Sequence, residues 1–299
     1  ALAGAHRSRY HGRGMDYRES RHYQAGDDIR NMDWRITARS GHPHVKVFDE
    51  ERERPVVVLV DFSASMFFAS QGVFKSVQAA RVAALIGWSA ILNGDRIGAL
   101  LFADADHDGD HRELAPAGGR RGQMRLIRAL TELGSPDAVL RGRSDAAAAD
   151  ADYGVSAALA RLRRVARPGS LVFLLSDFYG ADAESERHLT QLARHNDVQA
   201  LQIADPLELA PPPPGRYGIS DGRRTRVLDT RSRAERERYA SELEQHHRRV
   251  RGLAEACGVG LTRCLTTDDP LDCLTRLLAG GRDARADAGE DRPGQGAER

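Results

Sequence analysis

The chain has 299 residues and carries 44 lysine and arginine side chains against 43 aspartate and glutamate side chains, so its formal net charge is +1 at pH 7. A charge this close to zero argues against nucleic acid or an anionic membrane as the partner. No apolar stretch reaches the length of about 20 residues that crosses a bilayer, so we expect no transmembrane segment. The length suits either one large domain or one domain with an attached smaller unit.

The cysteines predict a location in the cell. Cys257, Cys264 and Cys273 are odd in number and lack the C-x-x-C spacing of a zinc or redox site. We therefore expect buried or free thiols, as in a reducing compartment. The first residues contain no apolar segment typical of a secretory signal. Together these observations predict a cytoplasmic protein.

The N-terminal segment, residues 1–54, combines charged, aromatic and glycine residues with little helical periodicity. It predicts an irregular flap with short extended segments. The interpretation we favour is a flap that covers a sheet edge through salt bridges. A surface for a substrate or nucleic acid is the alternative.

From residue 55 to residue 279, apolar strand patterns alternate with helical periodicity. The predicted strands are 56–60, 96–102, 171–175, 198–203 and 259–265, and the predicted helices are 74–92, 123–133, 153–165, 184–195, 233–257 and 269–278. A short edge hairpin is expected over 216–228. The alternation predicts an α/β fold with a doubly wound, mostly parallel sheet. Residues 280–299 have no apolar periodicity and predict a disordered tail.

Polar side chains follow two of these strands. The apolar run VVVLV ends at Asp61, and Ser63 and Ser65 follow at every second position, while Asp177 follows the strand at 171–175. Ligands of parallel sheets bind beyond the carboxyl ends of the strands. The carboxylate of Asp61 and the hydroxyls of the two serines suit a hard cation such as Mg²⁺ or Mn²⁺. If the two strands are neighbours, Asp177 would approach Asp61, and two close carboxylates repel each other unless a cation or a proton lies between them. The alternative interpretation is that the aspartates are helix N-caps or turn residues.

Several motifs, in order, carry a resemblance to a known family. The run from residue 12 to residue 66 that ends in DFSASM, together with NGDRIGALLF and LVFLLSDF, resembles the DUF58 family of bacterial proteins. The resemblance covers roughly residues 12–278. It implies a von Willebrand factor A-like core over residues 55–279 and an association with MoxR-type AAA+ ATPases.

The resemblance also implies a set of metal ligands. Asp61, Ser63 and Ser65 match the first loop of a metal-ion-dependent adhesion site, and Asp177 matches its third loop. The family's second loop has a threonine before the helix that precedes the strand at 171–175. The matching residues 150–154 contain no threonine, and Asp152 is the oxygen ligand that could substitute for it.

The function that follows is a non-enzymatic protein-binding module. In this hypothesis the site holds Mg²⁺ or Mn²⁺ with an open position, which a carboxylate of a partner completes. The resemblance implies that a MoxR-type AAA+ ATPase and an unidentified client protein are the partners, with this chain as adaptor in the assembly or remodelling of other proteins.

Two alternatives stay open. The first is a Mg²⁺-dependent phosphohydrolase with Asp61 as nucleophile. That chemistry needs an acid two residues later, where Ser63 stands, and a lysine for the phosphate, whereas neither Lys46 nor Lys75 has a suitable loop-to-helix context in the sequence. The second alternative is a structural scaffold with an empty metal site.

Overall fold

The structure is a computed structural model that describes residues 15–24, 26–50, 54–103, 111–135, 154–220 and 225–287. The chain forms two compact units, Ala1–Arg54 and Pro55–Arg299. Each unit has its own sheet.

The N-terminal unit is a two-stranded antiparallel sheet with a short helix. Its elements are β1 (Met15–His22), η1 (Ile29–Asn31), α1 (Trp34–Ser40) and β2 (His44–Glu50), and β1 pairs with β2. Asp33 begins α1, because its carboxylate accepts hydrogen bonds from the backbone of the helix's first turn, and the hydroxyl of Ser20 in β1 donates to the same side chain at 2.8 Å. Gly41 ends the helix with a φ of 74°, which only glycine adopts readily.

The second unit is built on a six-stranded sheet in the order β10-β7-β6-β3-β4-β5. Its strands are β3 (Pro55–Asp61), β4 (Arg96–Phe102), β5 (His111–Ala117), β6 (Leu171–Ser176), β7 (Asp197–Ala204) and β10 (Gly260–Leu265). All neighbouring pairs are parallel except β4 with β5, which is antiparallel. The central strand β3 is buried on both faces, as its uninterrupted apolar sequence requires.

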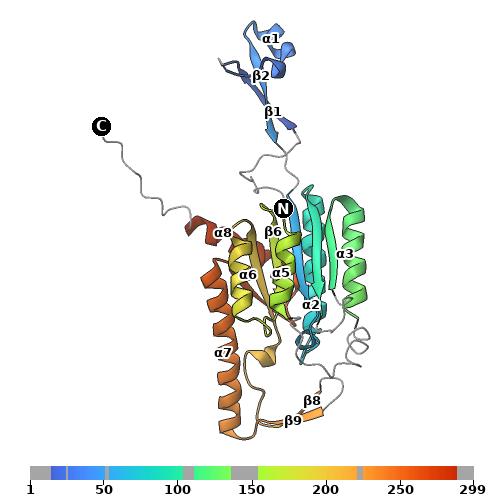
Figure 1. Ribbon diagram of the computed structural model, residues 1–299, viewed down its shortest axis with the longest axis vertical. Coiled ribbons are helices and arrows are strands. Elements are labelled where there is room, and N and C mark those ends of the chain that lie inside the picture. The colour runs from blue at the N-terminus through green and yellow to red at the C-terminus, as the bar shows by residue number, and fades with distance from the viewer. Residues whose placement is uncertain are drawn as a thin grey trace, which may run out of the picture. The chain divides into compact units, whose positions relative to one another are not determined.

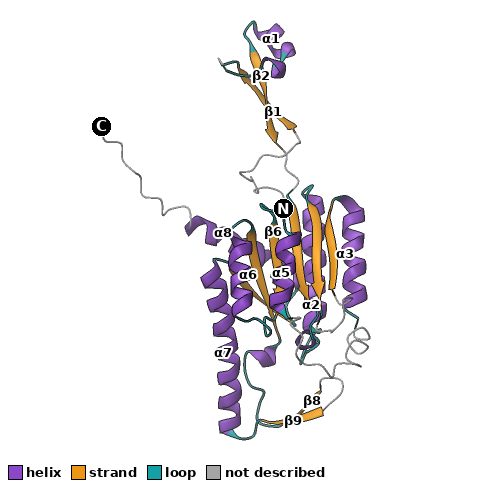
Figure 2. Ribbon diagram, in the orientation of Figure 1, coloured by secondary structure: helices purple, strands orange, loops and turns teal. Residues whose placement is uncertain are grey.

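Helices cover both faces of this sheet (Figures 1 and 2). They are α2 (Lys75–Leu92), α3 (Gly119–Leu133), α5 (Val155–Val165), α6 (Ala183–Ala193), α7 (Arg233–Cys257) and α8 (Pro270–Asp287). Alternate side chains of β3 enter two separate cores: Val58 packs with α2, α3 and α8, whereas Leu59 packs with α5, α6 and α7. The predicted fold class, a doubly wound and mostly parallel α/β sheet, is confirmed.

Two elements lie beyond this core pattern. Strands β8 (Arg216–Ser220) and β9 (Thr225–Asp229) form a separate antiparallel hairpin, where the sequence predicted one. Helix α8 continues to Asp287, past residue 280, where we expected a disordered tail to begin. The helix that starts at Pro270 therefore includes residues 280–287 of the segment for which we predicted a disordered tail. Residues 288–299 lie outside the described residues.

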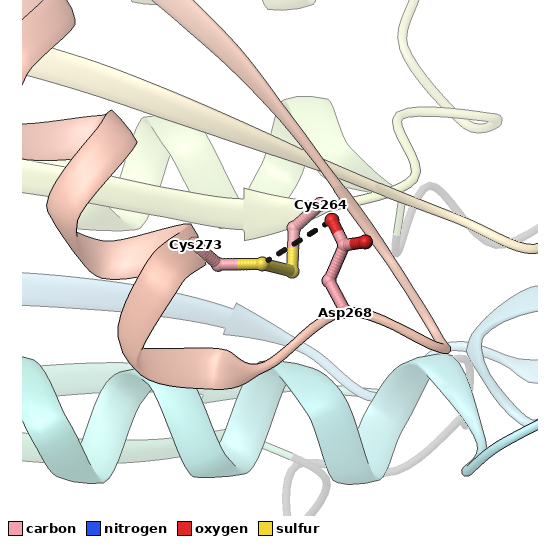
Figure 3. A group of neighbouring side chains, drawn as sticks. All are labelled: Cys264, Asp268 and Cys273. Atoms are coloured by element: carbon pink, nitrogen blue, oxygen red, sulfur yellow. Dashed lines mark hydrogen bonds between the residues drawn. A yellow bond between two sulfur atoms is a disulfide. The ribbon is translucent and has the colours of Figure 1, made fainter.

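The prediction of buried or free thiols is wrong for two of the three cysteines. Cys264 at the end of β10 and Cys273 in the first turns of α8 form a disulfide with a Cα–Cα distance of 5.5 Å (Figure 3). Their separation of 9 residues fits no redox or zinc motif, so the pairing depends on the way α8 packs back onto its own strand. Cys257 is a free, buried thiol.

Candidate functional site

The two predicted strand ends meet at the centre of the sheet. Strands β3 and β6 are hydrogen-bonded neighbours, and Asp61 is the last residue of β3 while Ser176 is the last residue of β6. The hydroxyl of Ser176 donates to Asp61 Oδ2 at 2.5 Å, and Asp177 follows directly in the chain. The parallel register therefore brings the carboxyl groups of Asp61 and Asp177 close enough to repel each other electrostatically.

The serines of the first loop converge beside Asp61. The backbone N–H of Ser63 donates to Asp61 Oδ1 at 2.7 Å, and the hydroxyl oxygens of Ser63 and Ser65 lie 3.2 Å apart. Ser63 begins a single 3-10 turn, η2 (Ala64–Met66). The convergence therefore comes from this turn and not from the extended chain that the alternating spacing suggested. Both serines are partly exposed, so their hydroxyls are accessible from outside the core.

Asp61 carries an unusual carboxyl group. Its side chain is buried, and burial together with the charge of Asp177 raises the pKa of Asp61 to about 7. The hydrogen bonds from Ser63 and Ser176 favour the charged form but do not offset the burial. Near neutral pH this carboxyl group therefore needs either a proton or a nearby cation.

Asp177 is held by contacts on all of its oxygen atoms. Its Oδ2 accepts from Lys75 Nζ at 2.8 Å, and its Oδ1 accepts from the backbone N–H of Tyr179 at 3.1 Å. Its carbonyl oxygen lies 2.9 Å from Nε2 of His246, so that nitrogen must carry the proton. Phe178, the residue between Asp177 and Tyr179, is buried and has a φ of 60°. This backbone conformation is unusual for a bulky residue and is found most often at functional sites.

A lysine that sequence analysis did not select lies at the centre of the site. Lys75 is the first residue of α2 and has no exposed surface, and its Nζ contacts Asp177 and also Glu208 Oε1 at 2.6 Å. The ammonium lies 5.2 Å from the ring centroid of Tyr179. Burial alone would lower the pKa of Lys75, but the charges of Asp177 and Glu208 outweigh it and raise that pKa.

Lys75, Asp177 and Glu208 form a buried triad, and the loop after β7 holds Glu208 in place. Glu208, in the short turn η3 (Pro206–Glu208), accepts the backbone N–H of Asp205 at its second oxygen, at 2.8 Å. Burial raises the pKa of Glu208, although Lys75 opposes the shift. The carbonyl of Glu208 lies 2.7 Å from Nε2 of His247 in α7. Helix α7 therefore contacts the loops after both β6 and β7 through adjacent histidines.

Tyr179 forms part of the outer wall of the site. Its ring stacks on His246 with the centroids 3.8 Å apart and the planes 2° apart, and 44% of the tyrosine is exposed. Burial lowers the pKa of His246, so the imidazole stays neutral at pH 7. A partly exposed aromatic side chain thus lies next to the candidate metal ligand Asp177.

A second cluster fixes the loop between β3 and α2. Asp205, at the end of β7, accepts hydrogen bonds from the backbone and hydroxyl of Ser70 and from the hydroxyl of Thr266 at 3.0 Å. Gly72 has a φ of +75°, and a Cβ at this position would collide with the carbonyl oxygen of Thr266. The loop that leads into Lys75 is therefore packed tightly against the ends of β7 and β10.

This close approach gives a testable prediction. Gly72→Ala is expected to destabilise the protein by at least about 1 kcal/mol more than Gly94→Ala, because both positions have positive φ but only Gly72 faces a backbone atom. Gly94, with a φ of +78° and open space around it, is the matched control. Urea unfolding of the two variants measures the difference. Equal losses would mean that the loop can move away from Thr266.

Asp152 and the other residues 150–153 lie outside the described residues. Cys264, Asp268 and Cys273 place three potential ligand atoms within 4.8 Å of one another (Figure 3). The sulfur atoms of Cys264 and Cys273 are bonded to each other, so the oxidised cluster offers no thiolate to an ion. The carboxylate of Asp268 forms a salt bridge with Arg276 at 2.6 Å.

Similar folds occur among solved structures. BatB from Bacteroides thetaiotaomicron matches with a TM-score of 0.45 and 15% sequence identity, over 77% of this chain and 99% of that chain. A von Willebrand factor type A protein from Catenulispora acidiphila matches with a TM-score of 0.42 and 13% identity, over 80% of this chain and 44% of that chain.

The prediction of a cytoplasmic protein is corrected by the disulfide between Cys264 and Cys273. It depended on unpaired thiols, and the disulfide between Cys264 and Cys273 removes that support, because disulfides are rare in reducing compartments. Among the described residues, no helix has the length and apolar character to cross a membrane.

Sequence comparison assigns the family. Uncharacterized proteins of Mycobacterium bovis and Mycobacterium tuberculosis are each 30% identical over 283 residues, which is 94% of this chain and 84% of theirs. The family model described as "Protein of unknown function DUF58" matches residues 19–249. The resemblance predicted from the motifs is confirmed, and the chain belongs to the DUF58 family.

Proposed function

We propose that this protein is a non-enzymatic protein-binding module whose contact site is organised by a divalent cation. The family and the α/β fold suggest a protein-interaction module. The observation that carries the finer proposal is the convergence of the Ser63 and Ser65 hydroxyls beside the buried carboxylate of Asp61. A bound Mg²⁺ or Mn²⁺ would supply an open position for a carboxylate of the partner.

The oxygen atoms present suit such an ion. In an octahedral site with metal–oxygen distances of about 2.1 Å, neighbouring ligands lie about 3 Å apart. The hydroxyl oxygens of Ser63 and Ser65 are 3.2 Å apart, which is close to that spacing. Each carboxylate oxygen of Asp61 accepts one hydrogen bond, so each retains capacity for another contact. Asp177 contributes negative charge next to these groups.

The partners are proposed from the family resemblance. A MoxR-type AAA+ ATPase would supply the energy for remodelling, while this chain would select or hold a client protein of unknown identity. Binding of the purified ATPase, measured with Mg²⁺ and again with a chelator, tests whether that contact uses the metal site. The near-neutral net charge argues against nucleic acid as the partner.

Phosphohydrolase activity is less consistent with the site. A phosphate-binding lysine must reach its substrate, but Lys75 is fully buried and its ammonium already contacts two carboxylates and an aromatic ring. Ser63 stands where a general acid would be needed. The arrangement therefore favours binding of a ligand over transfer of a phosphoryl group.

The ion site has a direct test. Titration calorimetry of the purified protein is expected to show binding of Mg²⁺ or Mn²⁺ that Ser63→Ala weakens about tenfold or more, because one hydroxyl ligand is lost. Ser89→Ala, which removes a hydroxyl from the C-terminal half of α2, is the matched control and should leave the affinity unchanged. Equal affinities for all three proteins would contradict the proposed ligand set.

A further inference from the structure

We infer that Lys75 is a built-in cation that competes with the metal ion for the charge of Asp177 and so limits how tightly the site holds that ion. The inference deepens the proposed function and rests on it. Its basis is the buried triad that Lys75 forms with Asp177 and Glu208, which the metal-site motif alone does not contain.

The contacts of Asp177 explain the competition. One oxygen of its carboxylate faces the ammonium of Lys75 at 2.8 Å, and the other accepts the backbone N–H of Tyr179. An ion held by Asp61, Ser63 and Ser65 would therefore meet an Asp177 whose charge is largely neutralised. It would also be repelled by the ammonium itself, because both cations share the same carboxylate.

Glu208 sets the strength of this competition. Its Oε1 accepts from Lys75 at 2.6 Å, and its Oε2 is held by the backbone of Asp205. Glu208 thereby shares the ammonium with Asp177. The side chains of Asp61, Asp177 and Glu208 supply three carboxylates against the one ammonium of Lys75, which leaves two formal negative charges for a dication to balance.

The triad predicts variant effects of opposite sign. Lys75→Gln removes the competing charge, keeps a hydrogen-bond donor and leaves Asp177 fully available, so the ion should bind more tightly. Glu208→Gln removes one negative charge and leaves the ammonium to Asp177 alone, so the ion should bind more weakly. If the role of the triad is purely structural, both variants should loosen the site and weaken the binding of the ion.

Titration of the metal-free protein with Mn²⁺, followed by calorimetry, tests the inference at a temperature where circular dichroism shows each variant to be folded. The association constant is expected to rise about tenfold or more in Lys75→Gln and to fall about tenfold or more in Glu208→Gln. Lys46→Gln is the matched control, since Lys46 is the other lysine of the chain and belongs to the separate N-terminal unit. It should bind Mn²⁺ as the parent protein does.

The possible outcomes separate this inference from the proposed function. Weaker or unchanged binding in Lys75→Gln, while the parent protein binds Mn²⁺, overturns the role of Lys75 and leaves the metal site intact. Binding that is detected only in Lys75→Gln supports the inference in its strongest form. No binding in any of the four proteins overturns the proposed metal site and the inference together.

Discussion

Asp61→Asn is expected to stabilise the metal-free protein at pH 8. In the folded protein, burial and the charge of Asp177 raise the pKa of Asp61 from 3.8 to about 7. The folded state therefore binds the proton more tightly than the unfolded state does. This contribution to the free energy of unfolding is fully present below about pH 4 and declines as the pH rises. Above about pH 7 it is lost, and the loss amounts to about 4 kcal/mol by linkage.

Asparagine removes this pH dependence because it has no charge to bury. Its oxygen can accept from the Ser63 backbone and its amino group can donate to the Ser176 hydroxyl, so both local contacts have a counterpart. Thermal unfolding in the presence of a chelator, between pH 4 and pH 8, measures the effect. The melting temperature of the parent protein should fall across this range by several degrees more than that of Asp61→Asn.

Asp205→Asn is the control for this experiment. Asp205 is also a buried aspartate at the end of a strand, but its pKa is lowered, because hydrogen bonds from Ser70, Leu207 and Thr266 outweigh its burial. Its neutralisation should therefore destabilise the protein at pH 8. If the melting temperatures of the parent protein and of Asp61→Asn change in parallel with pH, burial does not raise the pKa of Asp61.

Magnesium should act on the same group. At pH 8 the ion would take the position that the proton occupies at low pH, and would raise the melting temperature of the parent protein by mass action. The melting temperature of Asp61→Asn should rise little when the ion is added. Asp61 therefore links the proposed ion site to the stability of the fold.

The proximity of Asp61 and Asp177 could be predicted from the sequence for a physical reason. Asp61 directly follows an apolar run that is buried on both faces, and Asp177 follows a second such run with only Ser176 between them. The carboxyl ends of adjacent parallel strands meet at one edge of a sheet. The order of strands and helices could be predicted in the same way from periodicity. These features depend on short stretches of the chain and on general rules of sheet topology.

Lys75 and Glu208 could not be located in this way. They are 133 residues apart in the chain, and Lys75 is 102 residues from Asp177, so their contacts depend on how three loops pack together. The only signal in the sequence is that Lys75 is one of two lysines among 44 basic residues and precedes a helix. The same reason explains the missed disulfide, which depends on the packing of α8 against β10.

The buried triad also predicts a large change in stability. Lys75→Met is expected to cost about 3–5 kcal/mol, because it leaves the carboxylates of Asp177 and Glu208 buried without a cation. Urea unfolding in the presence of a chelator measures this loss. A cost below about 1 kcal/mol would mean that water or a proton readily replaces the ammonium.

The triple variant Lys75→Met, Asp177→Asn and Glu208→Gln distinguishes charge from shape. It removes all three charges while keeping similar volumes, so most of the stability lost in Lys75→Met should return, as is common when a buried ion network is replaced as a whole. The triple variant lacks the carboxylate of Asp177 and should bind Mn²⁺ more weakly than Lys75→Gln does. If the triple variant regains the stability lost in Lys75→Met but binds Mn²⁺ weakly, the fold does not need the three buried charges. Their role is then in the ion site.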